Sequence, residues 1–326
     1  MYYDLIIIGA GINGAGIARD AGLRGLTVLL LDKNDVGSGT SSWSTRLIHG
    51  GLRYLEYGEL NLVRESLRER EILLKIASHL VRPLPILIPL FQNSRRGKIM
   101  IRAGLFAYDL LSFQKSVPKH RMLSRAETLK QQPGLNPQGL LGAALYYDAQ
   151  VEFPERLVLE NVLSARQNGV EVLTYATVQK ISRDSNNNFI VSFTSRGDLQ
   201  EARARVVVNA SGPWVDQVLE PNGLDQPRLI GGTKGSHIVV APFDGAPSNG
   251  IYLEAQTDGR PFFVIPWNNN YLIGTTDVRF DSDPDDVRVE SWEANYLLNE
   301  TNRAFPQAKL TRRHVLYAYA GVRPLP

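Results

Sequence analysis

The stretch that decides the fold is Asp4–Asp35, which reads DLIIIGAGINGAGIARDAGLRGLTVLLLDKND. Leu5–Ile8 is a continuous apolar run, as expected of a parallel strand that is buried on both faces. It leads into three glycines with the spacing G-x-G-x-x-G, which are Gly9, Gly11 and Gly14. A helical pattern of small and apolar residues follows, and Thr27–Leu31 predicts a second buried strand that ends at Asp32. The order strand, glycine turn, helix, strand and acid predicts a βαβ unit that binds a dinucleotide.

Each residue of this motif has a physical reason to be where it is. Gly9 allows a tight turn, Gly11 lets a pyrophosphate approach the backbone, and Gly14 lets the helix pack against the strand. The N-terminus of the helix offers free N–H groups and a positive dipole to phosphate. Asp32 lies 23 residues after Gly9 and can accept hydrogen bonds from a ribose. The alternative is a purely structural glycine turn, and the motif alone does not separate NAD from FAD.

The composition excludes several classes of protein. The chain has 326 residues, enough for one large domain or two interleaved ones, and its hydrophobic content of 43% supports a sizeable core. A net charge of only +3 predicts that the whole molecule is not a polyanion binder, so no nucleic-acid partner is expected. The stretch Arg64–Arg125 is basic. It faces either an anionic partner such as a membrane or, as a solvated surface, only water.

Residues that the chain lacks exclude several kinds of site. There is no cysteine, which rules out disulfides, thiolate nucleophiles, cysteine-ligated metals and a cysteinyl-flavin bond. No cluster of histidines and acids has the spacing of metal ligands, so we expect no metal. The N-terminus has no basic region before its apolar run, and no apolar run reaches about 18 residues. We therefore expect neither a signal peptide nor a transmembrane helix.

The rest of the chain predicts an α/β fold with two discontinuous domains. Helices are expected at Glu59–Leu80, Arg95–Leu111, Pro154–Asn168 and Ser291–Arg303. Strands are expected at Pro83–Pro89, Val170–Leu173, Val178–Ser182, Phe189–Thr194 and Val206–Val208, and β signals dominate after Arg228. The first domain, Rossmann-like with a mostly parallel sheet, would use residues 1–84 and 148–222. The second, with an antiparallel sheet and helices, would use 85–147 and 223–326.

Several longer motifs carry a resemblance to a known family. They run in order along nearly the whole chain as TSSWSTRLIHGGLRYLE, VVVNASGPWVD, KGSHIVV, FFVIPW, LIGTTDV and YAGVRPL. The chain thereby resembles the FAD-dependent glycerol-3-phosphate dehydrogenases, which have a D-amino-acid-oxidase-like fold. The resemblance implies non-covalent FAD, the oxidation of glycerol 3-phosphate to dihydroxyacetone phosphate, and transfer of the electrons to a membrane quinone. It also implies a cytoplasmic protein that is peripheral on the inner face of the cell membrane.

The resemblance also assigns residues to the cofactor and the substrate. Gly9, Gly11 and Gly14 would hold the pyrophosphate, and Asp32 the adenosine ribose. The flavin end would be lined by Thr40, Ser41 and Ser42, with His49, Gly50 and Gly51 near the ring. Val178 would lie near the adenine, and Ala210, Ser211 and Gly212 beside the cofactor. The substrate pocket would contain Arg53, Tyr54, His237, Thr275 and Arg323.

The chemistry of a phosphorylated secondary alcohol favours arginines and one base in that pocket. The phosphate needs fixed cations, and the planar guanidinium forms paired charge-assisted hydrogen bonds, so Arg53 and Arg323 are the candidates. Their structural alternatives are an ion pair of Arg53 with Glu56 and a strand-end cap by Arg323. The hydroxyl proton needs a base with a near-neutral pKa, for which we favour His237. A buried structural histidine is the alternative for both His237 and His49.

Three points stay open at the level of the sequence. The acceptor could be oxygen instead of quinone, and Arg95–Leu111 could lie on an anionic membrane or pack on the core with its arginines in solvent. Family members continue past GVRPL with a segment that closes over the flavin, and this segment is expected to be absent because the chain stops at Pro326. A truncated, non-catalytic nucleotide-binding module and an NAD-dependent dehydrogenase are the other readings. An oligomer is possible.

Overall fold

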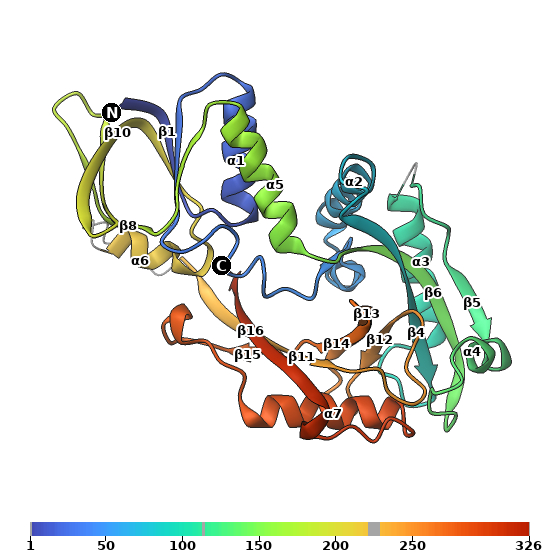
Figure 1. The fold of residues 1–326 in the computed structure, drawn as a ribbon. Coiled ribbons are helices and arrows are strands. Elements are labelled where there is room, and N and C mark those ends of the chain that lie inside the picture. The colour runs from blue at the N-terminus through green and yellow to red at the C-terminus, as the bar shows by residue number, and fades with distance from the viewer. Residues whose placement is uncertain (1, 113–114, 221–228, 326) are drawn as a thin grey trace.

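A computed structural model describes residues 2–112, 115–220 and 229–325, which form two units, each built on one sheet (Figure 1). The first sheet has the strand order β7-β2-β1-β10-β9-β8. Its strands are β1 (Tyr2–Ile8), β2 (Val28–Leu31), β7 (Glu171–Leu173), β8 (Ala176–Arg183), β9 (Phe189–Ser195) and β10 (Asp198–Asn209). β1 pairs in parallel with β2 and β10, and β2 pairs in parallel with β7. β8 and β9 complete the sheet as an antiparallel meander.

Both faces of the parallel strands are covered, which explains their unbroken apolar sequences. The helices α1 (Ile12–Leu23) and α5 (Pro154–Gln167) pack against each other and against one face. α1 contacts that layer through small residues such as Ala15 and Ala18, which are fully buried. On the other face, apolar side chains of β1 and β2 pack against β8, β9 and β10. The helix α6 (Val215–Leu219) follows the 3-10 helix η2 (Gly212–Trp214).

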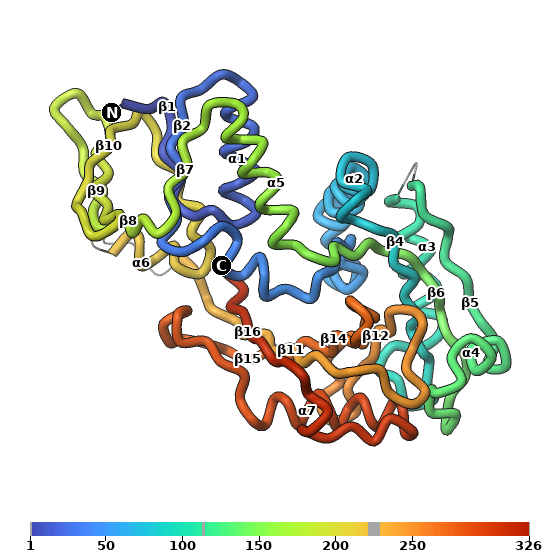
Figure 2. The backbone as a smooth tube through the Cα atoms, in the orientation of Figure 1, coloured from blue at the N-terminus to red at the C-terminus, as the bar shows by residue number. Residues whose placement is uncertain are grey.

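The second sheet is larger and mostly antiparallel. Its order is β15-β11-β14-β13-β12-β4-β6-β3, with β16 paired to β11 and β5 paired to β6. The strands are β3 (Leu47–Ile48), β4 (Val81–Phe91), β5 (Arg121–Ser124), β6 (Leu140–Val151), β11 (Gly231–Val240), β12 (Gly250–Glu254), β13 (Pro261–Trp267), β14 (Asn270–Gly274), β15 (Val278–Arg279) and β16 (Val315–Leu325). Among these pairs, β4 and β12 run parallel. The C-terminal end of β16 lies between the two units (Figure 2).

Helices cover both faces of the second sheet. α7 (Ser291–Ala304) packs on one face over a large apolar core, to which α4 (Arg125–Gln131) contributes Leu129. α2 (Leu60–Ile76) and α3 (Lys98–Leu111) pack on the opposite face together with the 3-10 helix η1 (Leu52–Tyr57). Two more 3-10 helices, η4 (Pro284–Asp286) and η5 (Arg312–His314), lie in the connections around α7. Among the described residues, no helix is long and apolar enough to cross a membrane.

The α/β fold class is confirmed, and the four predicted helices are present within a few residues of their expected ends. The predictions omitted β5, β6, β16 and α4. They also assigned residues up to 84 to the first domain, whereas β3 pairs with β6 and α2 packs on the second sheet. By sheet pairing and packing, the stretch from β3 to β4 therefore joins the second unit. The amino-acid pattern of this stretch does not indicate which sheet it joins, because an amphipathic helix packs equally well on either sheet.

Candidate active site

The glycine turn after β1 has the tight geometry that its motif predicts. Gly9 has a φ of +103°, and a Cβ there would lie 2.5 Å from the Ala210 carbonyl oxygen. A Cβ on Gly14 would lie 1.8 Å from the Gly9 carbonyl oxygen, so only glycine lets α1 start this close to the strand. A Cβ on Gly11 would meet the Ser41 hydroxyl at 3.3 Å. The turn therefore brings the N-terminus of α1 to the carboxyl ends of β1 and β10, where α/β folds bind phosphates.

Asp32 is fixed at the end of β2 by two backbone amides. The N–H of Ala10 donates to its Oδ2 at 2.6 Å, and the N–H of Asn34 donates to its Oδ1 at 2.8 Å. Burial raises the pKa of Asp32 above its usual value, and the two backbone hydrogen bonds oppose that effect. Each carboxylate oxygen keeps a further lone pair, so the side chain can still accept hydrogen bonds from a ribose.

A cleft of about 1290 Å³ runs from this turn to β16 of the second unit. Nine of the fourteen predicted cofactor residues line it, namely Gly9, Gly11, Asp32, Thr40, Ser41, Val178, Ala210, Ser211 and Gly212. Gly14 and Ser42 lie outside the lining, where Gly14 packs under the turn and the Ser42 hydroxyl donates to the Gly37 carbonyl at 2.6 Å. His49, Gly50 and Gly51 are not part of the lining either. Cofactor contact stays a prediction for all fourteen residues, and the cleft supports it for the nine that line it.

The chemistry of this lining fits a flavin dinucleotide. The first turn of α1 contains no acidic residue, so nothing there repels a pyrophosphate. The indole N–H of Trp214 is buried, and it has no hydrogen-bond partner among the described residues although Trp214 lines the cleft. A buried donor without a partner is costly, so it points to a ligand that supplies an acceptor. The residues present therefore fit FAD, with the glycine turn and Asp32 at one end and β16 at the other.

The loop that follows Asp32 is anchored on β16 by hydrogen bonds and close packing. The Thr40 hydroxyl donates to the Val322 carbonyl at 2.7 Å, and the Tyr319 hydroxyl donates to the Ser44 carbonyl at 2.8 Å. Gly321 leaves room for this contact, because a Cβ there would lie 2.8 Å from the Cβ of Trp43. These contacts join the two units along one wall of the cleft.

His237 lies on β11, next to Thr45 of this loop, and is almost completely buried. Its Nε2 lies 2.9 Å from the Thr45 hydroxyl, and its ring stacks on Tyr319 at a centroid distance of 4.9 Å. Its Nδ1 has no hydrogen-bond partner among the described residues. Burial lowers the pKa of His237 to about 3, and the positive charges of Arg323 and Arg46 act in the same direction. The predicted near-neutral pKa is therefore wrong for this structure, because both effects disfavour the imidazolium.

Arg323 and Thr275 lie beside His237 on the second sheet. The Arg323 guanidinium donates to the Thr276 carbonyl at 3.0 Å and pairs with Asp277 at 3.1 Å, and the side chain is 39% exposed. A Cβ on Gly235 would lie 2.4 Å from the Thr275 hydroxyl and 3.0 Å from Nη2 of Arg323. The two side chains therefore come together above Gly235. Because Asp277 uses only one Nη group, Arg323 keeps free donors for a second anion.

A buried ion pair holds the Thr275–Asp277 segment from below. Lys234 Nζ lies 2.8 Å from Oε2 of Glu293, and both side chains are buried. The hydroxyls of Ser236 and Thr276 each donate to Oε1 of Glu293 at 2.8 Å. Such a pair is stable only when its remaining donors and acceptors are satisfied, as they are here. The segment that accepts the hydrogen bonds of Arg323 is thus fixed from α7.

Arg53 and Tyr54 lie on the 3-10 helix η1. Both side chains are exposed, and no hydrogen bond or ion pair of Arg53 is found among the described residues. Glu56 pairs with Arg96, whose Nη2 donates to it at 3.0 Å, and no ion pair of Glu56 with Arg53 is found in the part of the chain that the structure describes. Arg96 is the main cause of the lowered pKa of Glu56, and the charge of Arg53 adds to it. The structure therefore brings together His237, Thr275 and Arg323, whereas contact of Arg53 and Tyr54 with the substrate stays a prediction.

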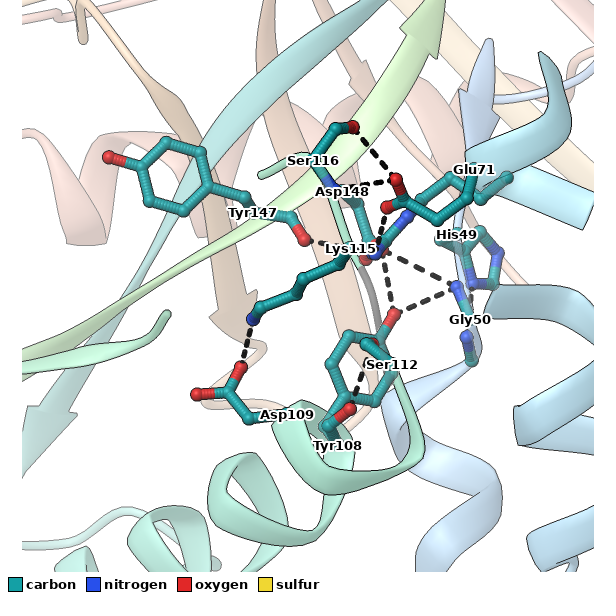
Figure 3. Close-up of polar contacts among 12 residues, drawn as sticks. His49, Gly50, Glu71, Tyr108, Asp109, Ser112, Lys115, Ser116, Tyr147 and Asp148 are labelled. Carbon is teal, nitrogen blue, oxygen red and sulfur yellow. Dashed lines mark hydrogen bonds and ion pairs between the residues drawn. The ribbon is translucent and has the colours of Figure 1, made fainter. Parts of the chain in front are cut away.

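The turn before η1 is built on glycines. Gly51 has a φ of +67°, and its N–H donates to Nδ1 of His49 at 3.0 Å (Figure 3 shows the surroundings of His49). Gly50 is buried, since a Cβ there would lie 2.4 Å from Leu67 and 2.7 Å from the Tyr108 hydroxyl. Gly50 therefore packs against the helices of the second unit.

Sequence reasoning missed five residues that shape the site: Trp43, Thr45, Arg46, Trp214 and Tyr319. Trp43 and Trp214 stand out in retrospect, because each is a large aromatic in a stretch of small residues that borders a motif. The alternation YAYAG before GVRPL was a strand signal that would have placed Tyr319 on one face. Arg46 is buried over the Trp267 ring at 4.4 Å and carries no local signal.

Comparison with known proteins also points to a protein that binds FAD. The sequence profile described as FAD dependent oxidoreductase matches residues 4–326. A glycerol-3-phosphate dehydrogenase of Synechocystis sp. is 52% identical over 99% of this chain and 61% of its own length. A D-erythritol 1-phosphate dehydrogenase of Brucella abortus is 41% identical over 99% of this chain and 63% of its own length. The chain thus spans about three fifths of the length of these curated relatives.

A solved structure shares the fold. The glycerol-3-phosphate dehydrogenase from Bacillus halodurans complexed with FAD superposes with a TM-score of 0.81 at 31% sequence identity. The match covers 99% of this chain and 57% of that chain.

Proposed function

Because the chain belongs to the family of FAD-dependent oxidoreductases, we propose that it oxidises sn-glycerol 3-phosphate to dihydroxyacetone phosphate. The observation that carries this proposal is that Arg323 lies near enough to a neutral, buried His237 to act on its pKa, beside a cleft that fits FAD. A fixed guanidinium next to a proton acceptor suits a substrate with a phosphate and a hydroxyl a few bonds apart. The identity to named glycerol-3-phosphate dehydrogenases supports the same substrate.

Each residue of the pocket then has a role. Arg323 binds the substrate phosphate with the guanidinium donors that Asp277 leaves free, and Arg53 supplies a second cation from η1. Thr275 orients a substrate oxygen through its hydroxyl. His237 accepts the hydroxyl proton. Burial is the main cause of its low pKa and the positive charge of Arg323 adds to it, so the dianionic phosphate near Arg323 favours the step by offsetting that charge. FAD, when bound, accepts the hydrogen on the substrate carbon as hydride.

The flavin spectrum of the purified chain with added FAD tests the proposal. We expect a yellow complex that sn-glycerol 3-phosphate bleaches under anaerobic conditions, whereas glycerol and inorganic phosphate leave it oxidised. A complex that stays oxidised with the substrate contradicts the proposed reaction. A chain that binds no flavin supports the reading as a non-catalytic module. Formation of reduced nicotinamide from added NAD would support an NAD-dependent dehydrogenase.

D-erythritol 1-phosphate is a second candidate substrate. The Brucella relative that bears this name is 41% identical over nearly the whole chain. Both compounds present a phosphate and neighbouring hydroxyls, so the same arginines could bind either one. Bleaching rates measured with both substrates at equal concentration decide between them, since we expect the faster reduction with glycerol 3-phosphate.

For the electron acceptor we infer a membrane quinone, with the protein peripheral on the inner face of the cell membrane. α3 supports this inference, because it has two apolar faces. Ile101, Leu105 and Tyr108 are buried against the second sheet, whereas an opposite stripe is exposed, namely Ile99, Met100, Phe106 and Leu110. An exposed apolar stripe beside the cations Lys98 and Arg102 suits the surface of an anionic bilayer. Peroxide release in air at the rate of substrate oxidation would favour oxygen instead.

A further inference from the structure

A fully buried polar network underlies the turn His49–Gly51 (Figure 3). The Gly50 N–H donates to the Tyr108 hydroxyl at 2.8 Å, and that hydroxyl donates to Oδ1 of Asp148 at 2.7 Å. Arg70 Nη1 lies 2.7 Å from the same carboxylate oxygen. Arg70, Tyr108 and Asp148 are at most 2% exposed. Side chains from three elements, α2, α3 and β6, therefore form the network that binds one backbone amide after the end of β3.

The network is anchored on its far side as well. Arg70 Nη2 donates to Glu71 at 3.0 Å and Arg70 Nη1 to the Tyr147 carbonyl at 3.0 Å. Glu71 in turn accepts from the N–H and the hydroxyl of Ser116 at 2.8 and 2.7 Å. Buried charges are expensive, and hydrophobic residues of similar volume often stabilise a core at least as well. What an apolar core would not supply is an acceptor for the buried Gly50 N–H.

The turn that the network holds also fixes the protonation of one ring nitrogen. Nδ1 of His49 accepts the Gly51 N–H at 3.0 Å, so this nitrogen carries no proton. In the neutral tautomer of this exposed residue, the proton is then on Nε2. In this tautomer the Nε2–H donates a hydrogen bond, and the ring presents no free acceptor.

We propose that Tyr108 and Asp148, supported by Arg70, are positioning residues that hold His49 as an Nε2–H donor to the bound substrate or cofactor. Two consecutive amides lock the turn: Gly50 is tied to the buried network and Gly51 to the imidazole. The network thereby connects the core of the second unit to the start of η1, which carries Arg53. This inference rests on the proposed function for its kinetic test and on geometry alone for its structural test.

Tyr108→Phe is the first test, because it removes one hydroxyl and keeps the ring. We expect hydrogen exchange of the segment 47–57 to rise roughly tenfold or more, since the Gly50 amide loses its nearer acceptor and keeps only Oδ1 of Asp148 at 3.4 Å. The matched control is Tyr146→Phe. Tyr146 is also buried and its ring lies 6.0 Å from that of Tyr108, but among the described residues it forms no hydrogen bond with Gly50. Unchanged exchange in Tyr108→Phe, or an equal rise in the control, would overturn the proposal.

Kinetics of flavin reduction separate positioning from general stability. His49→Ala should slow reduction, and His49→Gln should restore much of the rate because its amide offers a donor near the Nε2 position. Tyr108→Phe should slow reduction roughly tenfold in the wild-type background and add little to His49→Ala, because it acts through that residue. Additive losses in the double variant, or no rescue by His49→Gln, contradict the proposal.

The test still decides if Tyr108→Phe does not fold or if the wild-type flavin is not reduced. If Tyr108→Phe does not fold, Asp148→Asn replaces it, since the amide oxygen still accepts but the charge that anchors Tyr108 is lost. The exchange and kinetic criteria then apply to this variant unchanged. If the wild-type flavin is not reduced by glycerol 3-phosphate, the proposed function fails, whereas the exchange comparison of the variants still decides on the network.

Discussion

The pKa of His237 gives a stability test that does not depend on activity. Because the folded pKa is about 3 and the unfolded value is 6.5, the unfolded chain binds more protons between these pH values. The contribution of His237 to the free energy of unfolding is therefore fully present above pH 6.5 and is lost as the pH falls towards 3. His237→Gln, which can still reach the Thr45 hydroxyl, should flatten the pH dependence of the unfolding free energy by about 1.4 kcal/mol per pH unit between pH 4 and 6. Parallel pH curves for wild type and variant, measured by urea unfolding, would show that His237 is solvated.

Arg323 gives the corresponding test for the substrate. Arg323→Ala should raise the KM for glycerol 3-phosphate roughly 10- to 100-fold, because a charge-assisted contact is lost, while flavin content stays the same. Arg323→Lys should recover only part of this, since an ammonium lacks the planar fork. Arg279→Ala is the matched control, because this exposed arginine on β15 pairs with Asp281 outside the pocket. An unchanged KM in Arg323→Ala removes the residue from the phosphate site.

For the helix α1, two glycines two positions apart make opposite predictions. A Cβ on Gly14 would lie 1.8 Å from the Gly9 carbonyl oxygen, whereas a Cβ on Gly16 meets nothing within 4 Å. Gly14→Ala should therefore destabilise the chain by several kcal/mol and abolish FAD binding. Gly16→Ala should stabilise it by roughly 0.5–1 kcal/mol, since alanine is the better helix former. Thermal unfolding without FAD measures both, and equal effects of the two variants would contradict the packing described here.

For the helix α3, the exposed apolar side chains are the residues to change in a membrane test. Arg96 pairs with Glu56 and Glu254, so reversing its charge would disturb the fold instead of the surface. Phe106 and Leu110 are 66% and 69% exposed, and changing both to serine should weaken binding to anionic liposomes roughly tenfold or more. Leu199→Ser is the control, because this leucine is 70% exposed on β10 of the first unit. Binding that persists in the double variant excludes α3 as the membrane face.

The strength of the local pattern decided which elements the sequence could reveal. β1, α1 and β2 were readable because a continuous apolar run, three glycines and a terminal acid each report a different physical requirement. β6 was not, because its twelve residues, most of them buried, include Gly142 and the charged Asp148, which suggest a loop when Arg70 and Tyr108 are unknown. A polar residue that is paired only through the tertiary fold cannot be recognised from its neighbours in the sequence.

In the molecule as a whole, the site depends on contacts between distant segments. The family resemblance named His237, Thr275 and Arg323, and the structure brings these three together. The resemblance could not indicate that Arg46 lies near His237, because the two residues come from a loop and a strand about 190 positions apart. The low pKa of His237 therefore follows from the assembled units and not from any local motif.

The same assembly predicts how FAD couples the two units. Gly9 and Asp32 of the first unit and Tyr319 and Val322 of the second line one cleft. FAD at 100 times its Kd should therefore raise the stability of both by about 2.7 kcal/mol, which slows exchange of their core amides about 100-fold. Hydrogen exchange in β1 and in β14 should slow equally, whereas NAD, which lacks the flavin, should protect less of β16. Protection confined to the strands and helices of the first sheet would show that the flavin does not bridge the units.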